Sequence, residues 1–283
     1  MGWRQPPGAI IINMKPETIQ QLLDLNASFY QTFAVEFSAT RQRLQPGVER
    51  VVREYGVKPG EPAPNPARWL DLGCGNGELA LRLGQLGFTG VYLGLDFSPP
   101  LLELAREASR RIPDGSIRAR IEFREADLGR ADLDGILHGE RPFDAILAFA
   151  VLHHLPGRER RLNLFRRARE HLAPGGVFIH SVWQFQNSPR WQKRVVPWNH
   201  AGVEEHDLEP GDTLLDWRAT GDRLAPGLRY VHRFSEEELA VDAAASGFSI
   251  RETFYSDGRE GNLGLYQVWS PMVLPSGWPS GAS

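Results

Sequence analysis

Cysteine and long apolar runs are scarce in this chain of 283 residues. Cys74 is its only cysteine, which excludes a disulfide within the chain and a zinc site made of cysteines. No stretch approaches the roughly 18 consecutive apolar residues that a membrane-spanning helix needs. The first residues have neither the apolar core nor the small-residue cleavage site of a signal peptide. We therefore expect a cytoplasmic protein without a membrane partner.

Lysine is also rare, since only Lys15, Lys58 and Lys193 occur among 32 basic residues. Arginine favours planar, bidentate contacts with phosphate or carboxylate, but a GC-rich genome produces the same bias. The net charge of −3 argues against a generally basic nucleic-acid binder and leaves room for a local basic patch. The hydrophobic fraction of 41% is typical of a globular protein with a sizeable core.

Short apolar runs alternate with helical patterns after a proline-rich linker at residues 59–66. This alternation is typical of an α/β fold with a mostly parallel, doubly wound sheet and helices on both faces. We predict seven strands, at residues 69–72, 91–95, 120–124, 143–149, 176–183, 248–255 and 265–269. The predicted helices cover residues 16–55, 78–85, 99–110, 158–172 and a stretch that follows a capping box at Ser235 and Glu238.

These elements divide the chain into five predicted parts. Residues 184–230 break the alternation without a regular period, as lids and binding loops often do, and form an insertion after the fifth strand. The proline-, glycine- and serine-rich end is expected to be disordered. The parts are an N-terminal helical extension and linker (1–66), the core (67–183), the substrate-side insertion (184–230), the C-terminal helix and closing strands (231–270) and the tail (271–283).

A glycine-rich loop, Asp71-Leu-Gly-Cys-Gly-Asn-Gly77, joins the first strand of the sheet to the helix that follows it. Gly73 and Gly75 have no side chains, so a ligand can approach the backbone closely there. The Gly-x-Gly-x-Gly spacing differs from the Gly-x-Gly-x-x-Gly of dinucleotide-binding loops, which are the main rival explanation. A tight turn without a ligand is the second alternative.

Acidic residues follow the second and third strands. Asp96 comes 23 residues after Gly73 (96 minus 73), close to the spacing at which a strand-end acid reaches both hydroxyls of a ribose. Asp127 is placed to accept from an adenine amine while Leu128 packs on the ring, although Asp127 could instead cap a helix. Residues 149–154 should line the floor of the site, because ligands of open α/β sheets bind beyond the carboxyl ends of the strands.

His153 and His154 raise the question of a metal ion. Neighbouring side chains point in different directions, and no third ligand is spaced nearby, so we predict no metal site. We expect one of the two imidazoles to pack or form a hydrogen bond beside the ligand.

The strand-end residues together resemble those of the class I S-adenosylmethionine (SAM) dependent methyltransferases, which have a Rossmann-like fold. A narrower resemblance, to the tRNA wobble-uridine methyltransferases, covers most of the chain. Those enzymes esterify the carboxylate of 5-carboxymethyluridine in the anticodon. The similar segments are residues 26–41 with Phe-Ser-Ala-Thr-Arg at their end, 150–154 (Ala-Val-Leu-His-His), 196–198 (Val-Pro-Trp) and 229–234 (Arg-Tyr-Val-His-Arg-Phe).

The resemblance implies a SAM-dependent methyltransferase with tRNA as its partner and S-adenosylhomocysteine as its product. It places Tyr30 and Arg41 at the mouth of the site, and Arg229, Tyr230 and His232 near the modified base. With the strand-end analysis, the cofactor candidates are Tyr30, Arg41, Asp71, Gly73, Cys74, Gly75, Asn76, Asp96, Phe97, Ser98, Asp127, Leu128, Phe149, Ala150 and His154. The substrate candidates are Trp183, Trp198, Arg229, Tyr230 and His232, and the catalytic candidates are Arg41, Arg229 and His232.

A carboxylate acceptor needs no general base at neutral pH, because its pKa is near 4. Catalysis would then consist of positioning, with Arg41 or Arg229 orienting the carboxylate through paired hydrogen bonds. His232 would contact the substrate or brace the insertion. Tryptophans of the insertion would stack on an anticodon base or fill the core of a lid. The arginines at 158–169 would track phosphates or form a solvated helix face.

Two residues depart from the pattern of the family. Asn199 stands where a basic or imidazole side chain usually follows Val-Pro-Trp, and Leu263 replaces a tryptophan. Eukaryotic members also use a small zinc-binding activator that docks on the edge formed by the third strand. Residues 120–125 alternate charged and apolar side chains, as an uncovered edge does, so we expect no obligatory activator.

Two other functions fit the same cofactor site. One is an O- or N-methyltransferase for a small molecule, with the insertion as its lid. The other is a SAM-binding protein that transfers nothing.

Overall fold

The structure is a computed structural model that describes residues 14–39, 43–56, 67–112, 120–130, 132–217 and 227–272. Arg41, the linker predicted at 59–66 and the tail beyond residue 272 lie outside these ranges. None of the described helices has an apolar stretch long enough to cross a bilayer.

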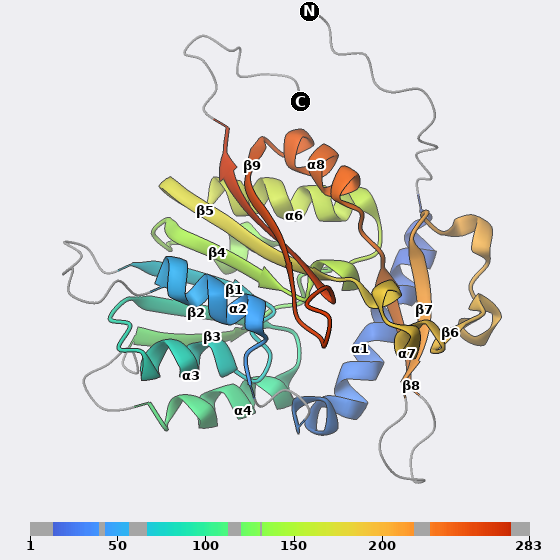
Figure 1. The fold of residues 1–283 in the computed structure, drawn as a ribbon, viewed down its shortest axis with the longest axis horizontal. Coiled ribbons are helices and arrows are strands. Elements are labelled where there is room, and N and C mark those ends of the chain that lie inside the picture. The colour runs from blue at the N-terminus through green and yellow to red at the C-terminus, as the bar shows by residue number, and fades with distance from the viewer. Residues whose placement is uncertain are drawn as a thin grey trace, which may run out of the picture.

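Seven strands form the main sheet, in the order β3-β2-β1-β4-β5-β10-β9 (Figure 1). β1 to β5 run parallel, and β10 runs antiparallel to both of its neighbours. The predicted seven-stranded, mostly parallel sheet is therefore confirmed. The strands are β1 (Arg68–Leu72), β2 (Val91–Asp96), β3 (Ile121–Glu125), β4 (Phe143–Phe149), β5 (Leu172–Trp183), β9 (Phe248–Ser256) and β10 (Gly264–Pro271).

Helices cover both faces of the sheet, and each face has its own apolar core. One core, with Leu79, Leu102 and Val51, packs under α2 (Pro46–Val51), η1 (Val52–Gly56), α3 (Glu78–Gln85) and α4 (Pro99–Ser109). The other, with Phe165 and Leu239, packs under α5 (Leu133–Ile136), α6 (Arg158–Glu170) and α8 (Glu236–Ala245). This two-sided covering is the doubly wound arrangement that the alternating pattern predicts.

The single helix predicted for residues 16–55 is wrong. α1 runs from Pro16 to Ala39, and α2 begins separately at Pro46. Proline disfavours helical backbone in the residue before it, and Gln45 is extended, with φ −66° and ψ 148°. Proline is well suited to the first turn of a helix, so Pro46 starts α2 instead of continuing α1.

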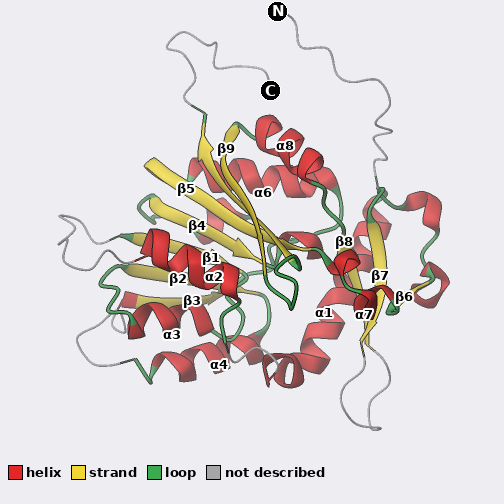
Figure 2. Ribbon diagram, viewed as in Figure 1, coloured by secondary structure: helices red, strands yellow, loops and turns green. Residues whose placement is uncertain are grey.

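The predicted insertion contains a second, three-stranded antiparallel sheet in the order β6-β7-β8 (Figure 2). Its last strand ends at His232, so the boundary predicted at residue 230 falls inside that strand. The sheet packs on α1 through a core that includes Leu22, Trp198 and Leu214. The elements are η4 (Phe185–Asn187), α7 (Pro189–Gln192), β6 (Val195–Val196), η5 (Trp198–Ala201), η6 (Glu205–Asp207), β7 (Asp212–Trp217) and β8 (Gly227–His232).

Candidate active site

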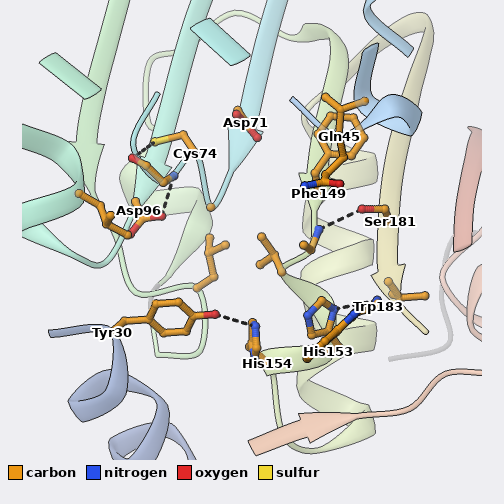
Figure 3. A pocket seen from close by; sticks show the side chains of 18 of the residues that line it. Tyr30, Gln45, Asp71, Cys74, Asp96, Phe149, His153, His154, Ser181 and Trp183 are labelled. Carbon is orange, nitrogen blue, oxygen red and sulfur yellow. Dashed lines mark hydrogen bonds between the residues drawn. The ribbon is translucent and has the colours of Figure 1, made fainter. Parts of the chain in front are cut away.

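A cavity of about 450 Å³ opens at the carboxyl ends of β1, β2 and β4. β1 is flanked by β2 on one side and β4 on the other, so the cavity lies where the chain changes direction across the sheet, the usual ligand site of such folds. α1, β8 and the turn between β9 and β10 complete its walls (Figure 3). Thirteen cofactor candidates line it: Tyr30, Asp71, Gly73, Cys74, Gly75, Asn76, Asp96, Phe97, Asp127, Leu128, Phe149, Ala150 and His154.

The glycine loop is held against the end of β2. The backbone N–H groups of Gly73 and Cys74 donate to the carbonyl oxygen of Leu95, at 2.7 and 2.9 Å. A Cβ on Gly73 would lie 2.3 Å from the side chain of Val151, whereas a Cβ on Gly75 would meet no atom within 4 Å. Gly75 therefore leaves the cradle open toward the cavity, and a side chain there would fill it.

The Asp96 carboxylate is buried and oriented by backbone donors. Its two oxygens accept from the N–H groups of Gly75 and Ser98, each at 2.9 Å, and each oxygen keeps a lone pair for another donor. Burial raises its pKa, which these backbone hydrogen bonds partly offset. Ser98 itself does not line the cavity, so its contribution is to hold Asp96 from behind.

Asp71 adds a second buried acid to the floor of the cavity. Burial raises its pKa to about 7, with a hydrogen bond from Tyr92 at 2.5 Å opposing the shift and the charge of Asp96 adding to it. A cation that binds beside these two carboxylates stabilises their ionised forms and lowers their pKa values. Burial also raises the pKa of the Cys74 thiol, so Cys74 is an inert packing group at neutral pH.

The Asp127 carboxylate lies at the far end of the cavity. It accepts from the N–H of Gly129 at 2.9 Å and pairs with Arg130 at 2.8 Å. It does not cap a helix, because α5 is capped by Asp132. Leu128 lies beside it in the wall.

The end of β4 enters the cavity in an unusual conformation. Ala150 has a left-handed backbone, with φ 55°, and its N–H donates to both the carbonyl and the hydroxyl oxygen of Ser181 at 3.1 Å. Alanine rarely adopts this conformation, and such residues cluster at functional sites.

Both histidines after β4 line the cavity, with their rings 4.3 Å apart. Nε2 of His154 lies 2.8 Å from the hydroxyl of Tyr30, and its Nδ1 lies 3.2 Å from the carbonyl oxygen of Tyr230. Nδ1 of His153 accepts from the backbone N–H of Trp183 at 3.3 Å (Figure 3). Each imidazole is thus engaged by neighbouring protein groups.

Arg229 provides a positive charge in the cavity wall. Only 3% of the residue is exposed, and its guanidinium lies between the rings of Phe29 and Trp183, about 5 Å from each centroid. No carboxylate of the described chain pairs with it, and its buried Nε has no hydrogen-bond partner. A buried, unpaired guanidinium facing a cavity is a strong candidate for binding an anion.

Three substrate candidates lie outside the cavity lining: Trp198, Tyr230 and His232. Trp198 packs in the core between α1 and the small sheet. Tyr230 donates to Asp212 at 2.8 Å, and His232 lies 2.7 Å from Asp212 and 2.8 Å from Glu238. The prediction that these three side chains contact the substrate is therefore corrected, because they lie away from the cavity. Arg41 cannot be placed, since it lies outside the described residues.

His232 belongs to a buried ionic cluster rather than to a metal centre. Burial and Arg161 lower its pKa, but the hydrogen bonds with Asp212 and Glu238 outweigh them and raise it. Ligand atoms of Glu209, Asp212 and His232 lie within 4.8 Å of one another. The guanidinium of Arg161 already meets Glu209 at 2.9 Å there, so the cluster carries its own cation.

The arginines of α6 do not form a free phosphate track. Arg158 pairs with Asp242, Arg161 with Glu209, and Arg167 with Asp134 and Glu170. The Arg167 side chain is 42% exposed and fits the solvated face that the sequence allows, whereas the buried Arg161 fits neither alternative.

Of the insertion tryptophans that the sequence offers for base stacking, Trp191 faces the same space as Trp183, with ring centroids 4.9 Å apart. The sequence did not single out Asp257 as a residue of the wall. The turn after β9 contributes Asp257, which accepts from the N–H of Gly47 at 2.9 Å and from the hydroxyl of Tyr266 at 2.6 Å. Its glycines, Gly258 and Gly261, were the available signal of a tight turn there.

Known proteins that are similar to this chain are methyltransferases. A family model described as a methyltransferase domain matches residues 39–253. A trans-aconitate 2-methyltransferase from Methylobacterium nodulans is 34% identical over 248 residues, which cover 87% of this chain and 78% of that protein. A tRNA (carboxymethyluridine(34)-5-O)-methyltransferase from Schizosaccharomyces pombe is 27% identical over 239 residues, 80% of this chain and 89% of that protein.

A probable tRNA methyltransferase 9B from Mus musculus is 28% identical over 191 residues, 66% of this chain. The matched region spans only 36% of that longer protein. Among solved structures, SAM-bound CalS10, an amino pentose methyltransferase from Micromonospora echinaspora, has a TM-score of 0.52 at 23% identity, over 84% of this chain and 97% of that one. The chain belongs to the methyltransferase domain family, and the domain that it forms is that of a SAM-dependent methyltransferase.

Proposed function

We propose that this protein methylates a carboxylate, and that its acceptor is the carboxymethyl group of a modified wobble uridine in tRNA. The observation that carries the proposal is Arg229, a buried guanidinium in the cavity wall that has no carboxylate partner in the described chain. Burying such a charge is costly unless an anion is supplied. A carboxylate acceptor supplies it.

The cavity offers residues that would hold SAM. Asp96 would accept from the ribose hydroxyls, Asp127 and Leu128 would hold the adenine, and the glycine loop with Asp71 would hold the methionine end. SAM supplies an electrophilic methyl group on a sulfonium. Its positive charge suits a cavity floor with two buried acids.

The chain's own residues then act by positioning. Arg229 orients the carboxylate through paired hydrogen bonds, and the flanking rings of Phe29 and Trp183 fix the guanidinium itself. The carboxylate is already ionised at neutral pH, so no group has to remove a proton. Trp183 and Trp191 provide an aromatic wall beside it on which a planar base can stack.

The comparisons support a carboxylate acceptor from two sides. The name of the fission-yeast relative specifies carboxymethyluridine, and the name of the Methylobacterium relative specifies trans-aconitate, an organic acid. The second relative favours a small organic acid as the alternative acceptor. The identity of 34% across most of both chains is the specific observation behind that alternative.

The deciding experiment incubates the protein with methyl-labelled SAM and one of three acceptors: tRNA bearing 5-carboxymethyluridine, the same tRNA without the modification, and trans-aconitate. We expect base-labile label in the modified tRNA alone. Label only in trans-aconitate would replace tRNA with the small acid. Bound SAM with no label in any acceptor would point to the silent binding protein. The assay uses the chain by itself, so it also tests the prediction that no activator is obligatory.

Arg229→Met removes the guanidinium and keeps most of the side-chain volume. We expect methyl transfer to fall by about a hundredfold or more, the loss that follows removal of a buried charge-assisted pair worth about 3 kcal/mol. SAM affinity should stay the same. Arg251→Met, at an exposed arginine on β9, is the matched control and should leave both quantities unchanged. Full transfer by Arg229→Met would refute the anchoring role.

A further inference from the structure

Ser181 lies near the end of β5, where its side chain points toward the cavity beside the bend that follows β4 (Figure 3). It is paired with Phe149 across the two parallel strands, and only 5% of the residue is exposed. Trp183 comes two residues later and lies on the same face of β5, because the side chains of a strand alternate. The guanidinium of Arg229 lies 5.0 Å from the Trp183 ring. The hydroxyl of Ser181 and this guanidinium therefore belong to the same wall of the cavity.

The hydrogen bond of the Ser181 side chain has only one possible direction. Its oxygen accepts from the backbone N–H of Ala150 at 3.1 Å, and a backbone N–H can only donate. The hydroxyl proton therefore points elsewhere, and no group within the described ranges accepts it. A buried donor without an acceptor is costly, and such a donor in a cavity wall is satisfied when a ligand supplies the acceptor.

We propose that Ser181 is a substrate-binding residue that donates its hydroxyl proton to the acceptor carboxylate and so selects a carboxylate over the corresponding amide. This inference rests on the proposed function, in which Arg229 orients the same carboxylate. The two oxygens of a carboxylate only accept, so they can satisfy the guanidinium and the hydroxyl together. A carboxamide has N–H groups in place of one oxygen. One of the two donors would then face another donor and lose its partner.

A second donor also suits the chemistry of the transfer. One carboxylate oxygen attacks the methyl carbon, the O–CH3 bond forms as the C–S bond breaks, and the electron pair of the broken bond stays on sulfur. No proton is transferred, so Ser181 acts as neither acid nor base. By holding the oxygen that does not attack, Ser181 leaves the lone pairs of the attacking oxygen free. The product ester has no charge, so both donors hold it less tightly than the acid.

Binding without turnover tests the proposal. The unmodified protein and Ser181→Ala are each saturated with S-adenosylhomocysteine and titrated with two probes, tRNA bearing 5-carboxymethyluridine and the same tRNA bearing 5-carbamoylmethyluridine. We expect the unmodified protein to bind the acid at least about tenfold more tightly than the amide, and Ser181→Ala to lower this ratio about tenfold, the effect of one hydrogen bond to a charged group. The kcat/KM for the acid should fall by the same factor. Ser181→Thr keeps the hydroxyl and should restore the ratio.

SAM affinity separates this role from bracing of the bend at Ala150. In Ser181→Ala the carbonyl oxygen of residue 181 still accepts from the Ala150 N–H, so the Kd for SAM should stay the same. Ser249→Ala is the matched control, since it removes an exposed hydroxyl on β9 that bonds Ser270. It should leave the ratio and the SAM affinity unchanged.

The outcomes distinguish Ser181 from the proposed function. An unchanged ratio in Ser181→Ala, or equal losses for acid and amide together with weaker SAM binding, would overturn the role of Ser181 and leave the proposed function intact. If label enters only trans-aconitate, a tenfold lower kcat/KM for that acid in Ser181→Ala would keep the role and replace the tRNA. An unmodified protein that methylates neither acid would overturn both.

Discussion

Arg229 and its neighbours on β8 show what a motif can and cannot predict about single side chains. Arg229, Tyr230 and His232 are close in sequence and were assigned together to the substrate. Side chains of a strand alternate between its two faces, so Arg229 points to the cavity while Tyr230 and His232 point to Asp212. The assignment failed because the irregular sequence around them hid the strand.

The residues of the glycine loop were easier to predict. Asp71, Gly75 and Asp96 all follow buried apolar strands, and the carboxyl ends of neighbouring parallel strands meet at one edge of the sheet. Each of these residues therefore stands beside a strand that can be recognised from the sequence alone. Asp257 reaches the cavity from the turn after β9, far away in the sequence, and no local pattern connects it with the glycine loop.

His180 lies fully buried on β5 among Phe165, Phe178 and Trp269, and neither ring nitrogen has a hydrogen-bond partner among the described residues. Burial lowers its pKa to about 3, from the usual 6.5. Below pH 6.5 the His180 imidazole is therefore protonated in the unfolded chain but stays neutral in the folded chain. The stability present above pH 6.5 is lost as the pH falls, by up to about 1.4 kcal/mol per pH unit until about pH 3.

We predict that His180→Leu removes this proton-linked loss. Urea unfolding at pH 7, 5.5 and 4.5 should show a pH slope that is smaller by about one proton in the variant than in the unmodified protein. His171→Leu, at a partly buried histidine that pairs with Asp134, is the comparison. Identical slopes in His180→Leu and the unmodified protein would contradict the expected protonation of the unfolded chain.

At the scale of elements, the order of strands and helices in the core followed from apolar periodicity, whereas the insertion did not. β7 runs Asp-Thr-Leu-Leu-Asp-Trp, and its acids are buried in pairs with His232 and Arg194. Buried charges of this kind remove the alternation of apolar and polar residues by which strands are recognised. These residues are recognised as a strand only once their contacts with residues distant in the sequence, such as His232, are known.

Arg161 on α6 joins the small sheet to the core. Its guanidinium is 1% exposed and meets Glu209 near β7 and Glu238 on α8. Removing one partner of a buried ion pair leaves the other charge uncompensated. We predict that Arg161→Met lowers the free energy of unfolding by about 3–5 kcal/mol. Hydrogen exchange should accelerate most in β7 and β8.

Arg166→Met is the control for Arg161→Met. Arg166 lies on the same helix, 43% exposed, with its nearest carboxylate at 4.0 Å. Its loss should change stability by less than about 0.5 kcal/mol. Equal effects of the two substitutions in chemical denaturation would show that the cluster contributes nothing beyond a surface charge.

At the scale of the whole molecule, the cavity is where the separate parts meet. α1 packs on the small sheet through Leu22 and Leu25, and its Tyr30 reaches the cavity of the main sheet. Arg229 of the small sheet and the turn after β9 line the same cavity. A ligand in the cavity therefore contacts α1, the main sheet and the small sheet at once.

We predict that SAM raises the thermal stability of the molecule as a unit. At a concentration one hundred times its Kd, a ligand stabilises the folded state by about 2.7 kcal/mol. For a domain of this size that corresponds to an increase in Tm of roughly 5–10 °C. Calorimetry should show one transition that moves. Two transitions, of which SAM shifts only one, would mean that the small sheet unfolds independently of the cofactor site.

The position of Cys74 gives this chain a built-in reporter. It is the only thiol, it lies in the glycine loop, and it is 8% exposed with a pKa raised by burial. Because Cys74 lines the cavity, a ligand bound there should shield the thiol from a maleimide or iodoacetamide. The slowing of alkylation by each ligand then ranks affinities without any assay of methyl transfer.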